Sequence, residues 1–138
     1  MNASDEARRV LSRYFGYPSF RPAQEPVVAS LLAGRDTVAV MPTGAGKSIC
    51  FQVPALLLNG VTVVISPLIS LMKDQVDALL GQGIPATFIN SSLDPAEADR
   101  RIDALIRGES RLVYVAPERL ENGWFQSQLN HIPIAMVA

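Results

Sequence analysis

The stretch AVMPTGAGKS, residues 39–48, decides how the rest of the chain is interpreted. It continues an apolar run, and we expect residues 36–41 to form a buried parallel strand. Gly44 and Gly46 then allow backbone conformations in which successive amide groups converge on one anion. A helix that begins at Lys47 would point free N–H groups and the positive end of its dipole at the same place. The pattern therefore predicts a phosphate-binding loop between a strand and a helix.

The side chains that end this stretch have separate expected roles in catalysis. Lys47 can reach the β- and γ-phosphates of a nucleotide, and the Ser48 hydroxyl can take a coordination position on Mg²⁺. The usual pattern, GxxxxGK[ST], has glycine where this chain has Met41. The competing interpretation is a glycine-rich turn that happens to end in Lys-Ser. The expected phosphate-binding positions are Pro42, Thr43, Gly44, Ala45, Gly46, Lys47 and Ser48.

The composition describes one ordered globular domain, with 138 residues of which 49% are hydrophobic and 18% are charged. A formal net charge of −1 provides no general positive field, so any contact with nucleic acid must be local. Cys50 is the only cysteine, which excludes an internal disulfide and a cysteine-based metal cluster. The charged start MNASDEARR and the interrupted apolar runs predict no signal peptide and no membrane span, and hence a cytoplasmic protein.

Apolar and amphipathic segments alternate along the chain, as in an α/β fold with a parallel sheet, right-handed crossovers and helices on both faces. We expect helix starts at Ser4 and at Asp94, where Glu97 reaches back to the cap. Pro26 is unfavourable inside the second helix, because a proline beyond the first turn removes a hydrogen bond, so we expect this helix to start late. The expected helices are 4–14, a segment ending near 33, 48–58, 69–80 and a segment from 95 to about 107. The expected strands are 36–41, 61–66, 86–90, 112–116 and 134–138.

Five motifs occur in one order along the chain: FGYPSFRPAQ (15–24), MPTGAGKS (41–48), SPLISLMKDQV (66–76), INSS (89–92) and VAPERL (115–120). In this order and at these spacings they resemble the first motor domain of RecQ-type DNA helicases of superfamily 2. The resemblance implies a RecA-like P-loop NTPase domain that uses ATP and Mg²⁺. Substitution of the first glycine of the loop is familiar in that superfamily.

The resemblance also implies that the segment before the phosphate loop recognises adenine. The matching positions in this sequence are Tyr17, Arg21 and Gln24. A glutamine amide offers both a donor and an acceptor to the N6 and N7 edge of adenine, and an aromatic ring or a guanidinium group can stack on the base.

The downstream motifs imply a path for single-stranded DNA at the ends of the strands, where open α/β sheets bind ligands. Backbone N–H groups and hydroxyls at helix starts can bind phosphates without a net positive charge. Lys73 has an alternative as a solvent-facing lysine, and Arg119 has an alternative as a partner of Glu118 or Asp74. The implied contacts are Ser66, Pro67, Leu68, Lys73, Asn90, Ser91, Pro117, Glu118 and Arg119.

In the family the strand at residues 134–138 is followed by a DEAH sequence, whose aspartate holds Mg²⁺ and whose glutamate positions water. We therefore expect residues 1–138 to be the N-terminal portion of the ATP-binding domain, ending before that motif, and to be inactive without the C-terminal helicase domains. The whole protein would unwind DNA in the 3′ to 5′ direction, in repair or recombination, in the bacterial cytosol or nucleoid. The alternatives are an RNA helicase of the same superfamily, a truncated nucleotide-binding module without catalysis, and a small-molecule kinase.

Three other residues are interpreted as structural. Cys50 is expected to be a small packing residue inside the helix after the loop, rather than a nucleophile. His131 has no neighbouring metal-ligand pattern. Trp124 can stack on a base, but an anchor that packs a short helix is the preferred interpretation.

Overall fold

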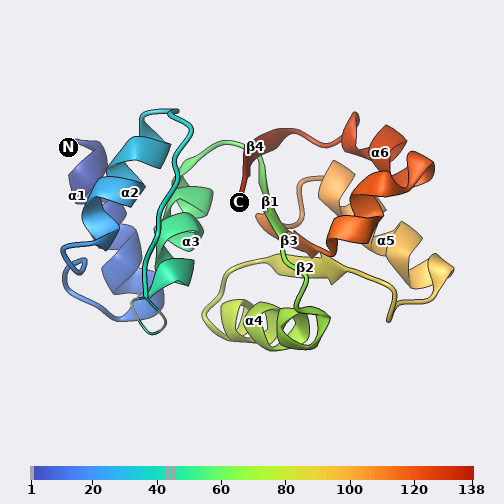
Figure 1. Cartoon of the computed structure of the whole chain (residues 1–138), viewed down its shortest axis with the longest axis horizontal. Helices are drawn as coiled ribbons and strands as arrows, with labels where there is room; N and C mark the ends of the chain where they lie inside the picture. Colours follow the sequence, from blue (N-terminus) through green and yellow to red (C-terminus); the bar gives the residue numbers. More distant parts are fainter. Residues whose placement is uncertain (1, 43, 45) are drawn as a thin grey trace. The chain divides into compact units, whose positions relative to one another are not determined.

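A computed structural model of the chain describes residues 2–42, 44 and 46–138. The chain divides into two compact units, Met1–Leu58 and Asn59–Ala138, and each is described here by itself. The first unit contains only helices and loops among its described residues, whereas the second contains a sheet with helices (Figure 1).

The first unit is built from α1 (Ala3–Val10), a π-helical turn (Leu11–Phe15), α2 (Gln24–Leu32) and α3 (Lys47–Leu57). The expected cap at Ser4 is wrong, because the helix begins earlier: the Asn2 side chain accepts a hydrogen bond of 2.9 Å from the backbone N–H of Asp5. Packing between the three α-helices and the π-helical turn buries a small apolar core. Its fully buried members are Ala7, Leu11, Val28 and Val53.

Pro26 is compatible with α2 because the helix starts late, as the sequence predicts. The helix starts at Gln24, which places Pro26 third in the helix. N–H groups in the first turn have no partner within a helix, so a proline there removes no hydrogen bond. In contrast, Pro54 lies inside α3.

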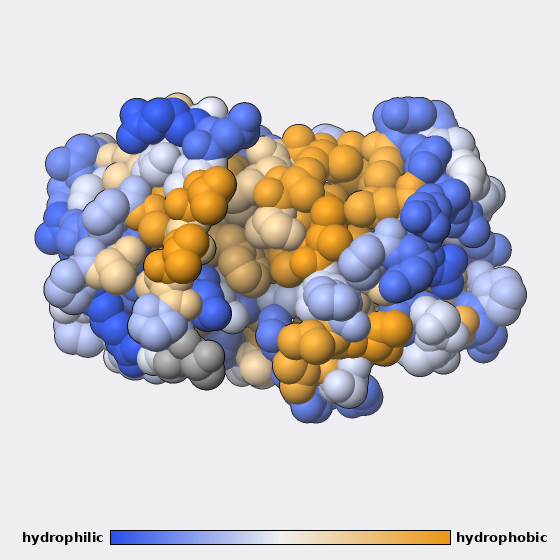
Figure 2. Space-filling view, in the orientation of Figure 1, coloured by the Kyte–Doolittle hydropathy of each residue, from blue (hydrophilic) through white to orange (hydrophobic). Residues whose placement is uncertain are grey.

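The expected strand at residues 36–41 is also wrong. No residue from 35 to 42 is in a strand, and Val38 and Val40 are both 93% exposed. A side-chain hydrogen bond of 2.7 Å between the hydroxyls of Ser30 and Thr37 connects the segment to α2. A strand exists only through hydrogen bonds to a neighbouring strand, and no strand is described in this unit. The apolar side chains of this segment therefore stay on the surface (Figure 2).

The second unit has a four-stranded sheet of β1 (Val61–Ile65), β2 (Ala86–Ile89), β3 (Leu112–Val115) and β4 (Ile134–Val137). Its order is β2-β3-β1-β4, and every pairing is parallel, as the sequence predicts. The chain moves in one direction from β1 to β2 and returns through β3 to β4. Right-handed crossovers then require helices on opposite faces for the two directions.

Helices cover both faces of this sheet, as expected (Figure 1). The face that carries Val63 and Val113 packs against α5 (Pro95–Ile106) and α6 (Gly123–Leu129). The other face lies towards α4 (Ile69–Gly81), whose buried residues are Met72, Val76 and Leu79. A short 3₁₀ helix, Pro117–Glu121, follows β3.

The start of α5 has the predicted cap, but not the predicted return contact. The Asp94 carboxylate accepts a hydrogen bond of 2.8 Å from the backbone N–H of Glu97. The Glu97 carboxylate instead binds two arginines, Arg101 at 2.9 Å and Arg100 at 2.6 Å. Hydrogen bonds from Arg101 and Arg100 lower the pKa of Glu97. This ion pairing replaces the reciprocal half of a capping box.

Candidate functional site

The phosphate loop has the backbone geometry that the sequence predicts. Gly44 and Gly46 have φ angles of +83° and +77°, a region that residues with a side chain rarely adopt. Directly after Gly46, α3 begins at Lys47 without a side-chain cap. Its first N–H groups are therefore available to an anion, which fits the phosphates of a nucleotide. Thr43 and Ala45 lie outside the described residues.

Lys47 and Ser48 stand at the first two positions of α3. Lys47 is exposed and Ser48 is half-buried. Within the described part of the chain, neither side chain has a hydrogen bond or an ion pair. An ammonium group and a hydroxyl group at a helix start are therefore free to meet phosphate and a phosphate-bound Mg²⁺, and the exposed Pro42 precedes them in the loop.

Two side chains from the upstream segment hold the loop in its conformation. Arg21 Nη1 donates to the carbonyl of Gly44 at 2.7 Å, and Gln24 Nε2 donates to the carbonyl of Gly46 at 3.0 Å. Gln24 Oε1 in turn accepts from the Arg21 backbone N–H at 2.9 Å. The two ends of a trans peptide point in opposite directions, so fixing the Gly46 carbonyl on Gln24 turns the N–H of Lys47 away from Gln24.

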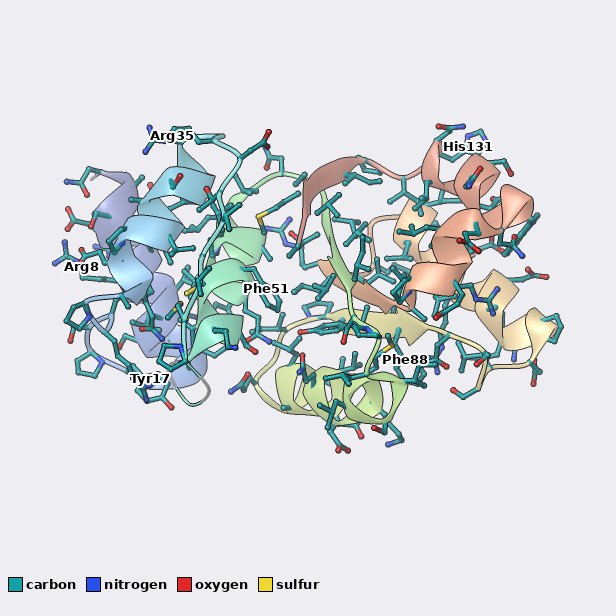
Figure 3. All side chains as sticks on the ribbon, viewed as in Figure 1. Arg8, Tyr17, Arg35, Phe51, Phe88 and His131 are labelled. Carbon is teal, nitrogen blue, oxygen red and sulfur yellow. The ribbon has the colours of Figure 1, made fainter. Side chains whose placement is uncertain are left out.

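The contacts to the loop use part of the hydrogen-bonding capacity of Arg21 and Gln24. Gln24 is only 5% exposed, and its amide uses one hydrogen and one lone pair in the contacts above. Half of its hydrogen-bonding capacity remains, because an amide has two hydrogens and two acceptor lone pairs. Tyr17 is 53% exposed in the loop before α2 (Figure 3). Adenine recognition by these three residues stays a prediction.

Cys50 packs beneath the loop, in the role that the sequence analysis prefers. Its Sγ lies 3.8 Å from Met41 Sδ and 3.9 Å from the Gly46 carbonyl oxygen. Burial raises the pKa of the Cys50 thiol, since a thiolate is disfavoured away from water. The residue is thus a neutral packing group next to the irregular first position of the motif.

In the second unit, the three downstream motifs emerge at one edge of the sheet. Ile65 pairs with Val115, and Val115 also pairs with Ile89, so three parallel strands end in register. The segments that begin at Ser66, Asn90 and Ala116 therefore start side by side. This is the edge at which ligands of open α/β sheets bind.

The segment after β1 presents backbone groups at this edge. Ser66 Oγ accepts from the backbone N–H of Leu68 at 3.2 Å, and α4 begins at Ile69 without a side-chain cap. Pro67 and Leu68 are exposed. Backbone N–H groups of a short exposed turn that leads into an uncapped helix start are available to an anion.

Asn90 lies at the centre of the edge and is 1% exposed. Its Oδ1 accepts from the backbone N–H of Ser92 at 2.8 Å, and its Nδ2 lies 3.4 Å from Met72 Sδ on α4. Arg119 Nη2 donates to the Asn90 backbone carbonyl at 3.2 Å. The sequence analysis did not anticipate Ser92 and Met72; the Asn-Ser-Ser order could have indicated the side-chain turn, because asparagine often bonds to the backbone two residues later.

The remaining residues that were expected to contact DNA differ in their partners and in their exposure. Lys73 Nζ binds Asp77 Oδ2 at 2.6 Å on the exposed face of α4, and this hydrogen bond raises the pKa of Lys73. The alternative partners of Arg119, Glu118 and Asp74, are not the ones it binds among the described residues, where its guanidinium donates to the Asn90 carbonyl. Ser91 and Glu118 are exposed, and Pro117 is half-buried at the start of the 3₁₀ helix.

Two other features are absent from the described residues. No cluster of three or more His, Cys, Asp or Glu residues is arranged to hold a metal ion among them. None of the helices described is long and apolar enough to cross a membrane.

A parallel α/β sheet, together with a glycine-rich loop that opens a helix, defines the class of P-loop nucleotide-binding proteins with a RecA-like fold. More narrowly, the chain belongs to the DEAD/DEAH box helicase family, whose model matches residues 21–137.

Relatives of known type include two bacterial proteins. The chain is 47% identical over 129 residues to the ATP-dependent DNA helicase RecQ of Pasteurella multocida, covering 94% of this chain and 20% of that protein. It is 47% identical over 133 residues to the ATP-dependent DNA helicase RecQ of Bacillus subtilis, covering 96% of this chain and 22% of that protein. The chain thus spans about a fifth of the length of these relatives.

A solved structure shares the fold. The crystal structure of the DUF1998 helicase MrfA bound to DNA superposes with a TM-score of 0.75 at 18% sequence identity, covering 99% of this chain and 21% of that chain. At this identity the likeness supports the RecA-like architecture alone.

Proposed function

We propose that this chain supplies the nucleotide-binding part and a portion of the single-stranded DNA path of a RecQ-type helicase that unwinds DNA in the 3′ to 5′ direction. The observation that carries the proposal is the loop in which Gly44 and Gly46 have positive φ angles directly before an uncapped helix at Lys47. The similarity to RecQ helicases over more than nine tenths of the chain supports the choice of DNA as substrate. Such a protein would work in the bacterial cytosol, at the nucleoid.

At the phosphate loop, the residues of this chain bind and orient. Lys47 would neutralise charge on the β- and γ-phosphates, while the backbone N–H groups of the loop fix their position. Ser48 would hold the Mg²⁺ of bound ATP through its hydroxyl, and the ATP would supply the phosphoanhydride bond whose hydrolysis drives movement. Tyr17, Arg21 and Gln24 would hold the adenine, and the contacts of Arg21 and Gln24 to the loop would connect the base to the phosphates.

At the sheet edge, the expected contacts to DNA are backbone and hydroxyl groups. Ser66, Ser91 and the uncapped start of α4 offer such groups at the ends of neighbouring strands. Phosphate contacts of this kind fix the position of a strand without reading its sequence. They are compatible with a chain whose net charge is −1.

Binding of a fluorescent ATP analogue, with and without Mg²⁺, tests the nucleotide proposal. We expect Lys47→Ala to reduce affinity at least tenfold, about the loss of one charge-assisted contact to phosphate. Lys73→Ala is the matched control, because it removes an exposed lysine that binds Asp77. Equal affinity for the protein and its Lys47→Ala variant would reject the proposed site.

Hydrolysis and unwinding test the wider proposal. We expect no ATP turnover by residues 1–138 alone, and steady turnover abolished by Lys47→Ala would contradict this. In a protein of the relatives' length that contains this chain, we expect a 3′-tailed DNA duplex to be unwound and the corresponding RNA duplex to be left intact. Preference for RNA would favour the RNA helicase alternative, and no turnover at any length would favour a nucleotide-binding module without catalysis.

A further inference from the structure

Asn90 connects the three segments that meet at the sheet edge. Its side chain contacts Met72 on α4 and Ser92 in the turn after β2, and its backbone carbonyl accepts from Arg119 in the 3₁₀ helix after β3. Each of these segments follows a different strand of the sheet. One residue therefore receives contacts from all three.

The asparagine side chain is buried, and its oxygen is fully occupied by these contacts. Its Oδ1 accepts from both the backbone N–H and the hydroxyl of Ser92, which uses both acceptor lone pairs. Its Nδ2 faces the Met72 sulfur, and the residue is 1% exposed. A DNA phosphate accepts hydrogen bonds, so only the Nδ2 donor could bind it. At 1% exposure and with Nδ2 directed at Met72, the side chain does not present that donor to DNA.

Arg119 is held in a similar inward orientation. It is half-buried, and its Nη2 donates to a backbone carbonyl at 3.2 Å rather than facing an acidic side chain. Hydrogen bonds from a charged donor to a carbonyl are stronger than those between neutral groups. The guanidinium group thus fixes the 3₁₀ helix relative to the turn at Asn90.

We propose that Asn90 and Arg119 are positioning residues, which set the spacing of the three DNA-facing segments and do not themselves contact DNA. The contacts to phosphate are then made by neighbouring groups such as Ser91 and Ser66. The inference rests on the proposed DNA path. It replaces the expectation from the sequence that both residues bind DNA directly.

Salt dependence separates the two roles of Arg119. A lysine or arginine that neutralises a phosphate releases counterions, so its removal lowers the slope of log affinity against log salt by about 0.7 for single strands. A residue that only positions other groups changes the affinity and leaves the slope unchanged. Arg119→Met should weaken binding of a fluorescein-labelled oligothymidylate by about tenfold or more, the effect of one lost hydrogen bond from a charged donor.

Two variants complete this set. Arg100→Met is the control for charge, because Arg100 is exposed on α5 and pairs with Glu97. It should change neither affinity nor slope. Arg119→Lys keeps the charge and one donor, and should retain most of the affinity. A slope that falls by about 0.7 in Arg119→Met, or an affinity that does not change, would overturn the proposal.

Hydrogen exchange in the absence of DNA tests the same link independently. The backbone N–H of Ser92 is protected by Asn90 Oδ1. We expect Arg119→Met and Asn90→Ala to raise its exchange rate about tenfold, as for the loss of one local hydrogen bond, and Arg100→Met to leave it unchanged. Unchanged exchange in Arg119→Met would overturn the link. If the unmodified chain exchanges as expected but binds no oligothymidylate, the proposed DNA path fails while the link between Arg119 and the turn stands.

Discussion

A short apolar run forms a strand in the second unit of the chain but not in the first. In each, a short run rich in valine comes directly before a predicted functional segment, at residues 36–41 and at Val61–Ile65. The run at Val61–Ile65 has a parallel neighbour on each side and is buried. The run at 36–41 has no paired strand, and two of its valines are 93% exposed. An apolar run therefore forms a strand only where neighbouring strands provide hydrogen-bond partners for its backbone.

The largest expected difference is between valines of the two units. Val113→Ala in β3 removes a side chain that is 1% exposed, and we expect the free energy of unfolding to fall by about 1.5–3 kcal/mol. Val38→Ala, at 93% exposure, should change it by less than about 0.5 kcal/mol. Urea unfolding of both variants measures the difference. A loss at Val38 as large as at Val113 would mean that residues 36–41 are buried in solution, and the comparison would break.

This contrast also explains how much of the fold the sequence could predict. Helix signals act locally, so the cap at Asp94, the start of α3 at Lys47 and the extent of α4 were predicted to within a residue or two. The four strands of the second unit were also predicted, because each is a short apolar run between turn signals. Whether the run at 36–41 pairs depends on partners distant in the sequence, and a single-sequence pattern contains no information on them.

For the candidate site, the sequence predicts which residues belong to the motif but not the hydrogen bonds that these residues form. The motif located Gly44, Gly46 and Lys47, because that chemistry requires glycine and lysine at fixed spacing. The hydrogen bonds of Gln24 to Gly46 and of Arg119 to Asn90 join residues more than twenty positions apart. Such contacts depend on how loops close, which periodicity and motif spacing do not describe.

The second prediction compares the loss of stability when either of two glycines with the same φ angle is replaced by alanine. Gly46 and Gly108 both have φ of +77°, but a Cβ at Gly46 would overlap the Gln24 amide, whereas none of the described atoms lies within 4 Å of one at Gly108. Gly108→Ala should cost about 1–2 kcal/mol from left-handed strain alone. Gly46→Ala should cost more, because Gln24 must also move.

Chemical denaturation of both glycine variants gives these costs, and the fluorescent ATP analogue gives a second comparison. Nucleotide affinity should fall only in Gly46→Ala. Equal losses of stability in the two variants would indicate that Gln24 does not hold the loop in solution. The hydrogen bond from Gln24 to Gly46 would then have no role in shaping the phosphate loop.

A third prediction concerns pH and the thiol under the loop. Burial raises the pKa of Cys50 above its ordinary value of 9.0. Below that pH the thiol is protonated in both the folded and the unfolded chain, so it contributes no pH dependence. As pH rises above about 9, the unfolded chain loses the proton first, and stability falls. The decline between pH 8.5 and 10 should be smaller in Cys50→Ala than in the unmodified chain. Identical pH profiles would show that the thiol is exposed.

The smallest expected effect compares ion pairs of the two units. Arg8 in α1 lies 3.5 Å from Asp5 on the surface, with about half of each side chain exposed. Arg101 in α5 binds Glu97, donates to the Phe88 carbonyl at 3.0 Å and stacks at 4.5 Å from the Phe88 ring. Exposed pairs contribute little to stability. Arg101, in contrast, also satisfies a carbonyl of the edge strand β2 and covers an aromatic ring (Figure 3 labels Arg8 and Phe88).

Thermal unfolding should therefore show a lower Tm for Arg101→Met and no measurable change for Arg8→Met. High salt should leave the Tm difference of Arg101→Met largely in place, because salt screens an exposed ion pair more than it screens the carbonyl and ring contacts. A difference that vanishes at high salt would reduce Arg101 to an ordinary surface pair, and β2 would then have no specific protection at its free edge.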